Sequence, residues 1–224
     1  MTTLTPTAAW EQMLEGNKRF VSGEPRHPNQ DVGRRHDLAD HQNPLATLFG
    51  CSDSRLAAEI IFDLGLGDLF VVRNAGQVIG ESIVASLEYA VGILEVPLIV
   101  VLAHDSCGAV RAAIDGTPID AEPLPPQIWK LIAPIVPAAR KVLAENGGGA
   151  VSDIDAELVG KEHLRNTVRN LLQSSEMIST AVAEGRLGIV GANYRLSEGT
   201  AVPVITVGIE SGIAVDPATL EGSK

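Results

Sequence analysis

Two short polar clusters carry residue types that bind a transition metal. The first holds Cys51, Asp53 and Arg55, and the second holds His104 and Cys107. An extended backbone projects residues two apart to the same side, so the first three side chains are expected to face one way. His104 and Cys107 are three apart, a spacing that one helical turn closes. Two thiolates and one imidazole form a set that zinc accepts, with a fourth position left for water, as in a catalytic rather than a structural site.

Apolar runs precede both clusters and recur along the chain. Four runs rich in branched residues are predicted to be strands, at residues 45–49, 69–72, 98–102 and 187–190. Helices are predicted between and around them, at residues 56–64, 81–94, 107–115, 127–145 and 153–184. Strands that alternate with helices indicate an α/β fold, with a mostly parallel central sheet of four strands and helices on both faces. Residues 194–206 are predicted to form a hairpin that adds an extra C-terminal edge strand.

The two clusters are expected to share one crevice. Residues 45–49 lead directly into the first cluster, and residues 98–102 lead directly into the second. In an open parallel sheet, ligands bind outside the carboxyl ends of the strands. A thiolate at Cys107 would also be stabilised by the exposed N–H groups at the start of the helix that follows.

The N-terminal segment is predicted to be a helix with one apolar face. Residues 7–22 place apolar groups at helical spacing, among them Trp10, Met13 and Phe20. A lone helix must bury such a face, and we expect it to pack on a partner subunit. The chain as a whole, residues 1–224, is interpreted as one domain. It comprises a helical arm at about residues 7–42 and a zinc-binding core at about residues 43–210.

Composition narrows the class of partner. Seventeen Lys and Arg against 28 Asp and Glu give a net charge of -11, which disfavours nucleic acid and anionic membranes. The longest apolar stretch, residues 96–103, is far shorter than the roughly 20 residues of a membrane-spanning helix. The N-terminus lacks an export signal, so a cytoplasmic protein is predicted. In that compartment, the two cysteines are not expected to form a standing disulfide.

Each of these residues, taken alone, also has an ordinary structural interpretation. A cysteine after an apolar strand is usually a small buried hydrophobe, and an Asp53–Arg55 pair can be an ordinary surface salt bridge. A redox role for Cys51 and Cys107 is a further, weak alternative. Four other histidines lie in polar contexts and are expected to be solvated, namely His27, His36, His41 and His163. The joint placement of two cysteines and a histidine at strand ends favours the metal.

These residues resemble the β-class carbonic anhydrases over roughly residues 7–210. The resemblance lies in three motifs: Cys51-Ser-Asp53-Ser-Arg55, Arg73-Asn74-Ala75-Gly76 and His104-Asp-Ser-Cys107-Gly108. It implies reversible hydration of CO₂ to bicarbonate and a proton, by attack of zinc-bound hydroxide, with Zn²⁺ held by Cys51, His104 and Cys107. It also implies that the family's working unit is at least a dimer, so a homodimer or a dimer of dimers is expected.

The resemblance assigns further roles residue by residue. Asp53 and Arg55 match a catalytic dyad in which the carboxylate accepts a hydrogen bond from zinc-bound water, although in some members this aspartate becomes a fourth ligand. Gln42 and the Gly108 N–H match substrate contacts. Phe70 and Tyr89 match positions that line the CO₂ pocket, in part from the neighbouring subunit, although both can equally be plain core aromatics.

Two rivals keep the metal site and change its use. One is a carbonyl sulfide or carbon disulfide hydrolase on the same fold, which differs in access to the pocket. The other is a noncatalytic zinc-binding or CO₂-sensing module, against which the presence of Asp53, Arg55 and Gln42 speaks.

Zinc with two thiolates and a neutral imidazole has zero net charge, so it lowers the pKa of a bound water less than a site with three histidines does. The CO₂ hydration activity is therefore expected to rise at alkaline pH.

Overall fold

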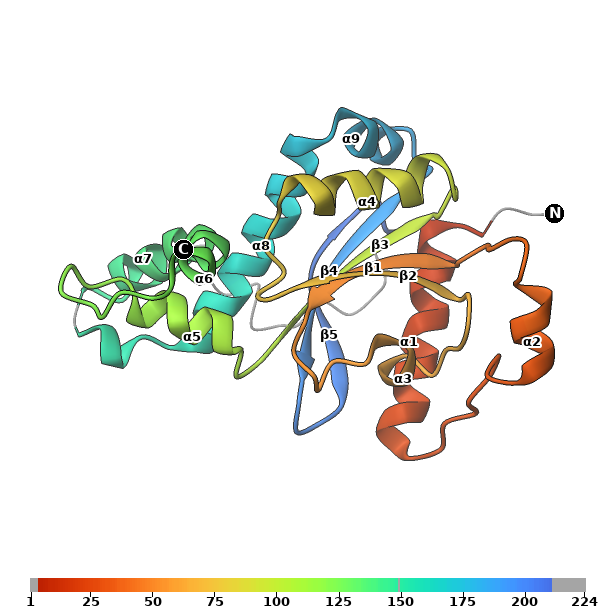
Figure 1. Cartoon of the computed structure of the whole chain (residues 1–224), viewed down its shortest axis with the longest axis horizontal. Helices are drawn as coiled ribbons and strands as arrows, with labels where there is room; N and C mark the ends of the chain where they lie inside the picture. Colours follow the sequence, from red (N-terminus) through yellow and green to blue (C-terminus); the bar gives the residue numbers. More distant parts are fainter. Residues whose placement is uncertain (1–3, 149, 211–224) are drawn as a thin grey trace.

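A five-stranded sheet forms the centre of the molecule (Figure 1). The computed structural model describes residues 4–148 and 150–210, so the two ends of the expected domain lie outside the described residues. The strands are β1 (Ala46–Cys51), β2 (Leu69–Asn74), β3 (Leu98–His104), β4 (Gly188–Arg195) and β5 (Thr200–Val207). Their order is β2-β1-β3-β4-β5, with the first four parallel and β5 antiparallel to β4. The predicted sheet with its extra C-terminal edge strand is confirmed.

The strands continue past their apolar runs as far as the polar clusters. Cys51 is the last residue of β1 and pairs with Asn74 of β2. His104 is the last residue of β3 and pairs with Tyr194 of β4. Since β1 and β3 are neighbours in the sheet, their carboxyl ends bring the two clusters together, as predicted.

Helices cover both faces of the sheet. Alternate residues of β3 point into two separate apolar clusters, because successive side chains of a strand face opposite sides. One face packs against α4 (Glu81–Gly92), α8 (Ala156–Ser174) and α9 (Glu176–Ala183). The other packs against α1 (Pro6–Ser22), α3 (Ala58–Ile61), α5 (Gly108–Asp115), α6 (Pro126–Ile132) and α7 (Val136–Glu145). Figure 1 shows α5, α6 and α7 grouped beyond the carboxyl ends of the strands, next to α8.

The N-terminal helix α1 buries its apolar face within its own chain. The Thr5 hydroxyl caps the helix by accepting a hydrogen bond from Ala8 N, and the helix ends at Gly23 in the left-handed conformation. Trp10 and Met13 are fully buried, and the Trp10 ring meets Phe62 edge-on. A partner subunit is therefore not needed to cover this face. The packing of α1 on a partner subunit, like the assembly of the chain, stays a prediction.

Three predicted helices differ in extent from the structure. Residues 56–64 yield only the single turn α3, and residues 127–145 divide into α6, a 3₁₀ turn (Ala133–Ile135) and α7. Pro134 and Pro137 lack the N–H groups that a continuous helix requires there. A 3₁₀ turn (Val151–Asp153) ends where residues 153–184 begin, and these residues then form α8 and α9. The two helices are separated at Ser175, whose hydroxyl accepts from Ile178 N and so begins α9.

The N-terminal arm also holds α2 (Val32–Asp37), a short surface helix that contains the exposed His36. Among the described residues, none of the helices is both long and apolar enough to span a bilayer. The cytoplasmic location expected from the sequence stays a prediction.

Candidate metal centre

The three predicted ligands converge at the carboxyl ends of β1 and β3. Cys51 Sγ, Cys107 Sγ and a ring nitrogen of His104 all lie within 4.8 Å of one another, and all three residues are buried. Ser106 adopts a left-handed φ of 50°, which turns the chain sharply between β3 and α5. Cys107 then stands directly before α5, at its N-cap. The turn thereby returns the second sulfur to the histidine that ends β3.

The hydrogen bonding of His104 leaves one nitrogen available for a metal. Its Nδ1 lies 2.8 Å from the carbonyl oxygen of Asp105. Because a carbonyl only accepts, Nδ1 carries the proton, and Nε2 keeps its lone pair. This buried Nε2 finds no hydrogen-bond partner among the residues that the structure describes. A buried, unpaired acceptor beside two sulfurs fits a bound metal ion.

The two thiols interact strongly with each other. The hydrogen bond from Cys107 lowers the pKa of Cys51 to about 4, against the opposing effect of burial. The same contact, together with burial, raises the pKa of the Cys107 thiol, although the N–H groups of Val110 and Ala109 lower it. The pair therefore shares one proton, which a bound cation would displace.

Asp53 and Arg55 form the predicted pair beside the ligands. Arg55 Nε donates to Asp53 Oδ1 at 2.9 Å, and Arg55 Nη2 donates to Oδ2 at 2.7 Å. The Arg55 guanidinium holds the pKa of the Asp53 carboxyl well below its ordinary value. Asp53 Oδ2 lies 3.9 Å from His104 Nε2, so a charged carboxylate stands at the edge of the ligand cluster.

Arg73 fixes the backbone that carries this pair. From β2, its Nε donates to the Cys51 carbonyl at 2.9 Å, and its Nη2 donates to the Asp53 carbonyl at 2.6 Å. From the sequence, Arg73 is recognised only as part of a motif, without a role. A charged residue directly after the apolar run 69–72 was the signal that could have identified it.

Gly76 supports the Cys51 sulfur from the turn after β2. Its N–H donates to Cys51 Sγ at 3.3 Å. The residue has a φ of 80°, and a Cβ there would lie 3.0 Å from both Ala109 Cβ and Ile135 Cδ1. Only glycine combines this conformation with so close an approach to α5.

The predicted substrate contacts divide into two groups. Gly108 is the first residue of α5 and directly follows Cys107, so it lies at the metal centre. Gln42 instead lines a hollow of about 500 Å³ together with Tyr89, and the Tyr89 ring lies 6.0 Å from that of Phe70. Gln42, Tyr89 and Phe70 lie near the amino end of β1. With a rise of about 3.3 Å per residue, β1 separates that end from Cys51 by about 17 Å. Within one chain, Gln42, Phe70 and Tyr89 therefore lie apart from the metal centre.

Tyr89 is 47% exposed, so it is not an ordinary core aromatic within one chain.

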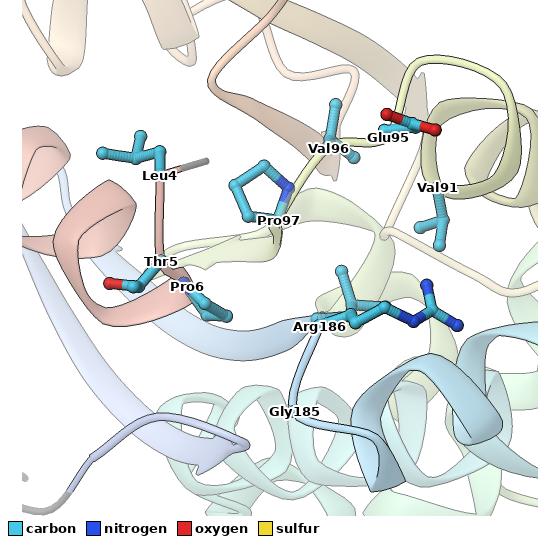
Figure 2. Close-up of a pocket in the computed structure, with 10 residues that line it drawn as sticks. Leu4, Thr5, Pro6, Val91, Glu95, Val96, Pro97, Gly185 and Arg186 are labelled. Atoms are coloured by element: carbon cyan, nitrogen blue, oxygen red, sulfur yellow. The ribbon is translucent and has the colours of Figure 1, made fainter. Parts of the chain in front are cut away.

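A second hollow, of about 420 Å³, lies at the amino ends of β3 and β4 (Figure 2). Its charged side chains are Glu95 and Arg186, and Arg186 pairs with Glu184. None of the residues that line this hollow is a cysteine or histidine, so it offers no set of ligands like that at the opposite end of the sheet.

One histidine prediction is wrong. His163 was expected to be solvated, but it is 3% exposed, and its Nε2 contacts the Gly76 carbonyl at 2.8 Å. The signal was available in the spacing of α8, where Val159, His163 and Thr167 recur every four residues on the buried face.

The fold and the site together define a class of protein. A cluster of two cysteines and one histidine, at the carboxyl ends of neighbouring parallel strands and beside an Asp–Arg pair, identifies an α/β protein with a candidate catalytic metal centre. Comparison with known proteins gives the family. The model of the carbonic anhydrase family matches residues 46–201, and the chain belongs to the β-carbonic anhydrases.

Curated relatives match nearly the whole chain. Carbonic anhydrase 2 of Mycobacterium tuberculosis is 47% identical over 210 residues, which cover 90% of this chain and 94% of that protein. A carbonic anhydrase of Mycolicibacterium smegmatis is 44% identical and covers 89% and 93% of the two chains. Among solved structures, the β-carbonic anhydrase CcaA superposes with a TM-score of 0.68 at 26% identity, over 88% of this chain and 95% of that one.

Proposed function

We propose that this protein catalyses the reversible hydration of CO₂ to bicarbonate and a proton, with Zn²⁺ held by Cys51, His104 and Cys107. The observation that carries the proposal is the buried set of two sulfurs and one unpaired imidazole nitrogen, with a charged carboxylate 3.9 Å from that nitrogen. Membership of the β-carbonic anhydrase family and the names of the curated relatives support the same reaction.

The donor set fits zinc by its chemistry. Thiolate sulfur and imidazole nitrogen are the ligands that Zn²⁺ takes in tetrahedral sites, and three protein ligands leave one position for solvent. When bound, the metal supplies a water that is acidic enough to act as a nucleophile near neutral pH. The two thiolates neutralise its charge, so the activity is expected to rise on the alkaline side.

Asp53 and Arg55 orient the reacting water. Both carboxylate oxygens of Asp53 accept from Arg55, which fixes the plane of the carboxylate next to His104. Because the pKa of Asp53 is depressed, the carboxylate acts as a hydrogen-bond acceptor and is a poor store for a proton. The proton released in each turnover therefore passes to buffer. The two bonds from Arg55 favour this role for Asp53 over that of a fourth metal ligand.

Substrate contacts come from two copies of the chain. The Gly108 N–H lies beside the metal centre, at the start of α5, where unpaired amides attract oxygen atoms that carry negative charge. Gln42, Phe70 and Tyr89 lie at the far end of β1, so a second subunit supplies them to the site. The exposed Tyr89 and Ile93 on α4 and its end provide apolar surface for that contact. The working unit is then a homodimer or a dimer of dimers.

Stopped-flow CO₂ hydration by the zinc-loaded protein, at several pH values, tests the proposal. We expect activity that increases above neutral pH and depends on buffer concentration. Assays with carbonyl sulfide and carbon disulfide are the control for the rival on the same fold. Hydrolysis of either compound without CO₂ hydration would reassign the substrate, and zinc binding without any turnover would indicate a noncatalytic module.

A further inference from the structure

His163 lies on the buried face of α8 and contacts the turn after β2 that supports the Cys51 sulfur. Its Nε2 is 2.8 Å from the carbonyl oxygen of Gly76. A carbonyl only accepts, so Nε2 carries the proton and Nδ1 is bare. Nδ1 has no partner within the described part of the chain. Burial lowers the pKa of His163, which keeps the ring neutral. The bond from Nε2 to the Gly76 carbonyl is therefore the one hydrogen bond that the His163 ring makes within the described part of the chain.

The turn that His163 contacts is conformationally demanding. Gly76 and Gln77 both have positive φ, at 80° and 41°, and both are buried. A left-handed non-glycine residue is unfavourable and persists only where its surroundings hold it. Asn74 closes the turn from one side, since its side chain donates to the Val78 carbonyl and accepts from Val78 N.

Helix α8 holds the same turn from the other side. His163 donates to the Gly76 carbonyl, and one helical turn later the Thr167 hydroxyl lies 3.4 Å from the Gln77 carbonyl. The Gly76 N–H, on the opposite side of the same residue, donates to Cys51 Sγ. His163, Gly76 and Cys51 therefore form one connected path from α8 to a metal ligand.

We infer that His163 is a positioning residue of the metal centre, whose bond to the Gly76 carbonyl holds the Gly76 N–H on the Cys51 sulfur. The inference rests on the metal site of the proposed function. Without this bond, the Gly76 carbonyl is buried and unpaired, and the turn relaxes towards another partner. The Cys51 thiolate then loses its N–H donor and its fixed orientation. Groups that orient metal ligands typically account for 10-fold to 100-fold in metal affinity.

The test compares His163→Leu, His163→Gln and a matched control, Leu164→Ala. Leu164 is the next residue of α8 and is fully buried, but it packs on the sheet cluster away from the turn. We expect His163→Leu to release zinc to a chelator about 10-fold faster than the wild type, because the Cys51 sulfur is then less firmly oriented towards the metal. It should also shift the sulfur-to-metal absorption band of the cobalt-loaded protein. His163→Gln keeps an N–H donor and should recover part of both properties.

The control separates positioning from general stability. Leu164→Ala should unfold at a lower temperature yet keep wild-type zinc release and an unshifted cobalt band. The inference is overturned if His163→Leu keeps both wild-type properties, or if Leu164→Ala releases zinc equally fast. Neither readout involves CO₂. A wild type that binds zinc but hydrates no CO₂ therefore refutes the proposed function alone.

A measurement on the wild type covers the case in which His163→Leu does not fold. Nitrogen NMR of the histidine rings should show His163 neutral and protonated at Nε2, with its Nε2–H proton protected from exchange. A ring protonated at Nδ1, or one that exchanges freely with solvent, would refute the bond to Gly76 and the inference with it.

Discussion

The two ends of the central sheet gather different kinds of residue. At the carboxyl ends of β1 and β3, a buried set of two sulfurs and one imidazole comes together within one chain, with the partly exposed carboxylate of Asp53 at its edge. At the amino ends, hollows are lined by mixed apolar and polar residues, among them Gln42 and the half-exposed Tyr89. Under the proposed function, one chain supplies the candidate metal ligands and the Gly108 N–H, whereas the contacts from Gln42 and Tyr89 would come from a second copy.

The largest expected effect is at the carboxyl end. Cys107→Ser replaces a thiolate by a hydroxyl that binds zinc poorly, so the zinc should be lost along with the CO₂ hydration activity. The loss should be at least about 100-fold, since even groups outside the first ligand sphere account for 10-fold to 100-fold. Zinc content and stopped-flow hydration measure it. Gln42→Ala, at the amino end, is the control and should keep its zinc; full activity in Cys107→Ser would break the ligand assignment.

The next prediction tests whether the two ends meet between subunits. Cys107→Ser and Gln42→Ala should each be weakly active alone, because each lacks one half of every site. Unfolded together and refolded as a mixture, they should recover about a quarter of wild-type activity, since half of the dimers are mixed and each mixed dimer holds one intact site. Each variant refolded alone is the control. No recovery in demonstrably mixed dimers would mean that Gln42 does not act across subunits.

A smaller effect is expected at the Asp53–Arg55 pair. Asp53→Ala removes the carboxylate that we propose orients the reacting water, but none of the three proposed metal ligands. Turnover should fall about 100-fold, the lower range for the loss of one positioned hydrogen-bonding group at a reacting atom, while zinc stays bound. Asp115→Ala serves as the matched control, because that carboxylate pairs with Arg111 on the surface of α5. Asp53→Ala with wild-type turnover would remove the dyad from the mechanism, and loss of zinc would make Asp53 a ligand.

The smallest effect on activity is expected at Asp63, which lies outside the metal centre. Its carboxylate accepts from Arg19 Nε and from the backbone N–H groups of Arg26 and His27, and it thereby ties the N-terminal arm to the end of α3. Asp63→Asn should lower the free energy of unfolding by about 2 kcal/mol, since bonds to a charged group are lost. CO₂ hydration at neutral pH should stay unchanged. Denaturant unfolding measures the difference, and Asp115→Asn should change it little.

Because of the Asp63 carboxyl, the free energy of unfolding is expected to depend on pH. Burial raises the pKa of Asp63, but the N–H groups of Arg26 and His27 and the Arg19 guanidinium outweigh it and lower the pKa below its ordinary value. A depressed pKa stabilises the folded state above the unfolded value of about 3.9, and this contribution is lost as the pH falls below it. The stability gap between the wild type and Asp63→Asn should therefore narrow in acid. A gap that stays constant from neutral pH to about pH 3 would contradict the assignment.

Local patterns were sufficient to predict the sheet and the cluster of candidate metal ligands. Apolar runs of branched residues mark β1 to β4, and two of these runs lead directly into Cys51 and His104. The convergence then follows from the neighbouring positions of β1 and β3. The ends of helices were harder to place: the break at Ser175 depends on its capping bond and on a contact with Glu88, which is distant in sequence.

Contacts between distant segments account for what sequence reasoning missed. His163 contacts a carbonyl 87 positions away, and Arg73 donates to carbonyls at and just after the end of the neighbouring strand β1. Neither partner can be identified from spacing along the chain. The separation of Gln42 from Cys51 was different, because the strand predicted at residues 45–49 already lies between the two residues.

The CO₂ hydration rate of metal-free protein during stepwise addition of zinc tests the proposed zinc-dependent catalysis most directly. The activity should rise with each addition and reach its plateau at one zinc ion per chain. Protein that holds one zinc ion per chain but hydrates CO₂ no faster than buffer would contradict the proposed catalysis.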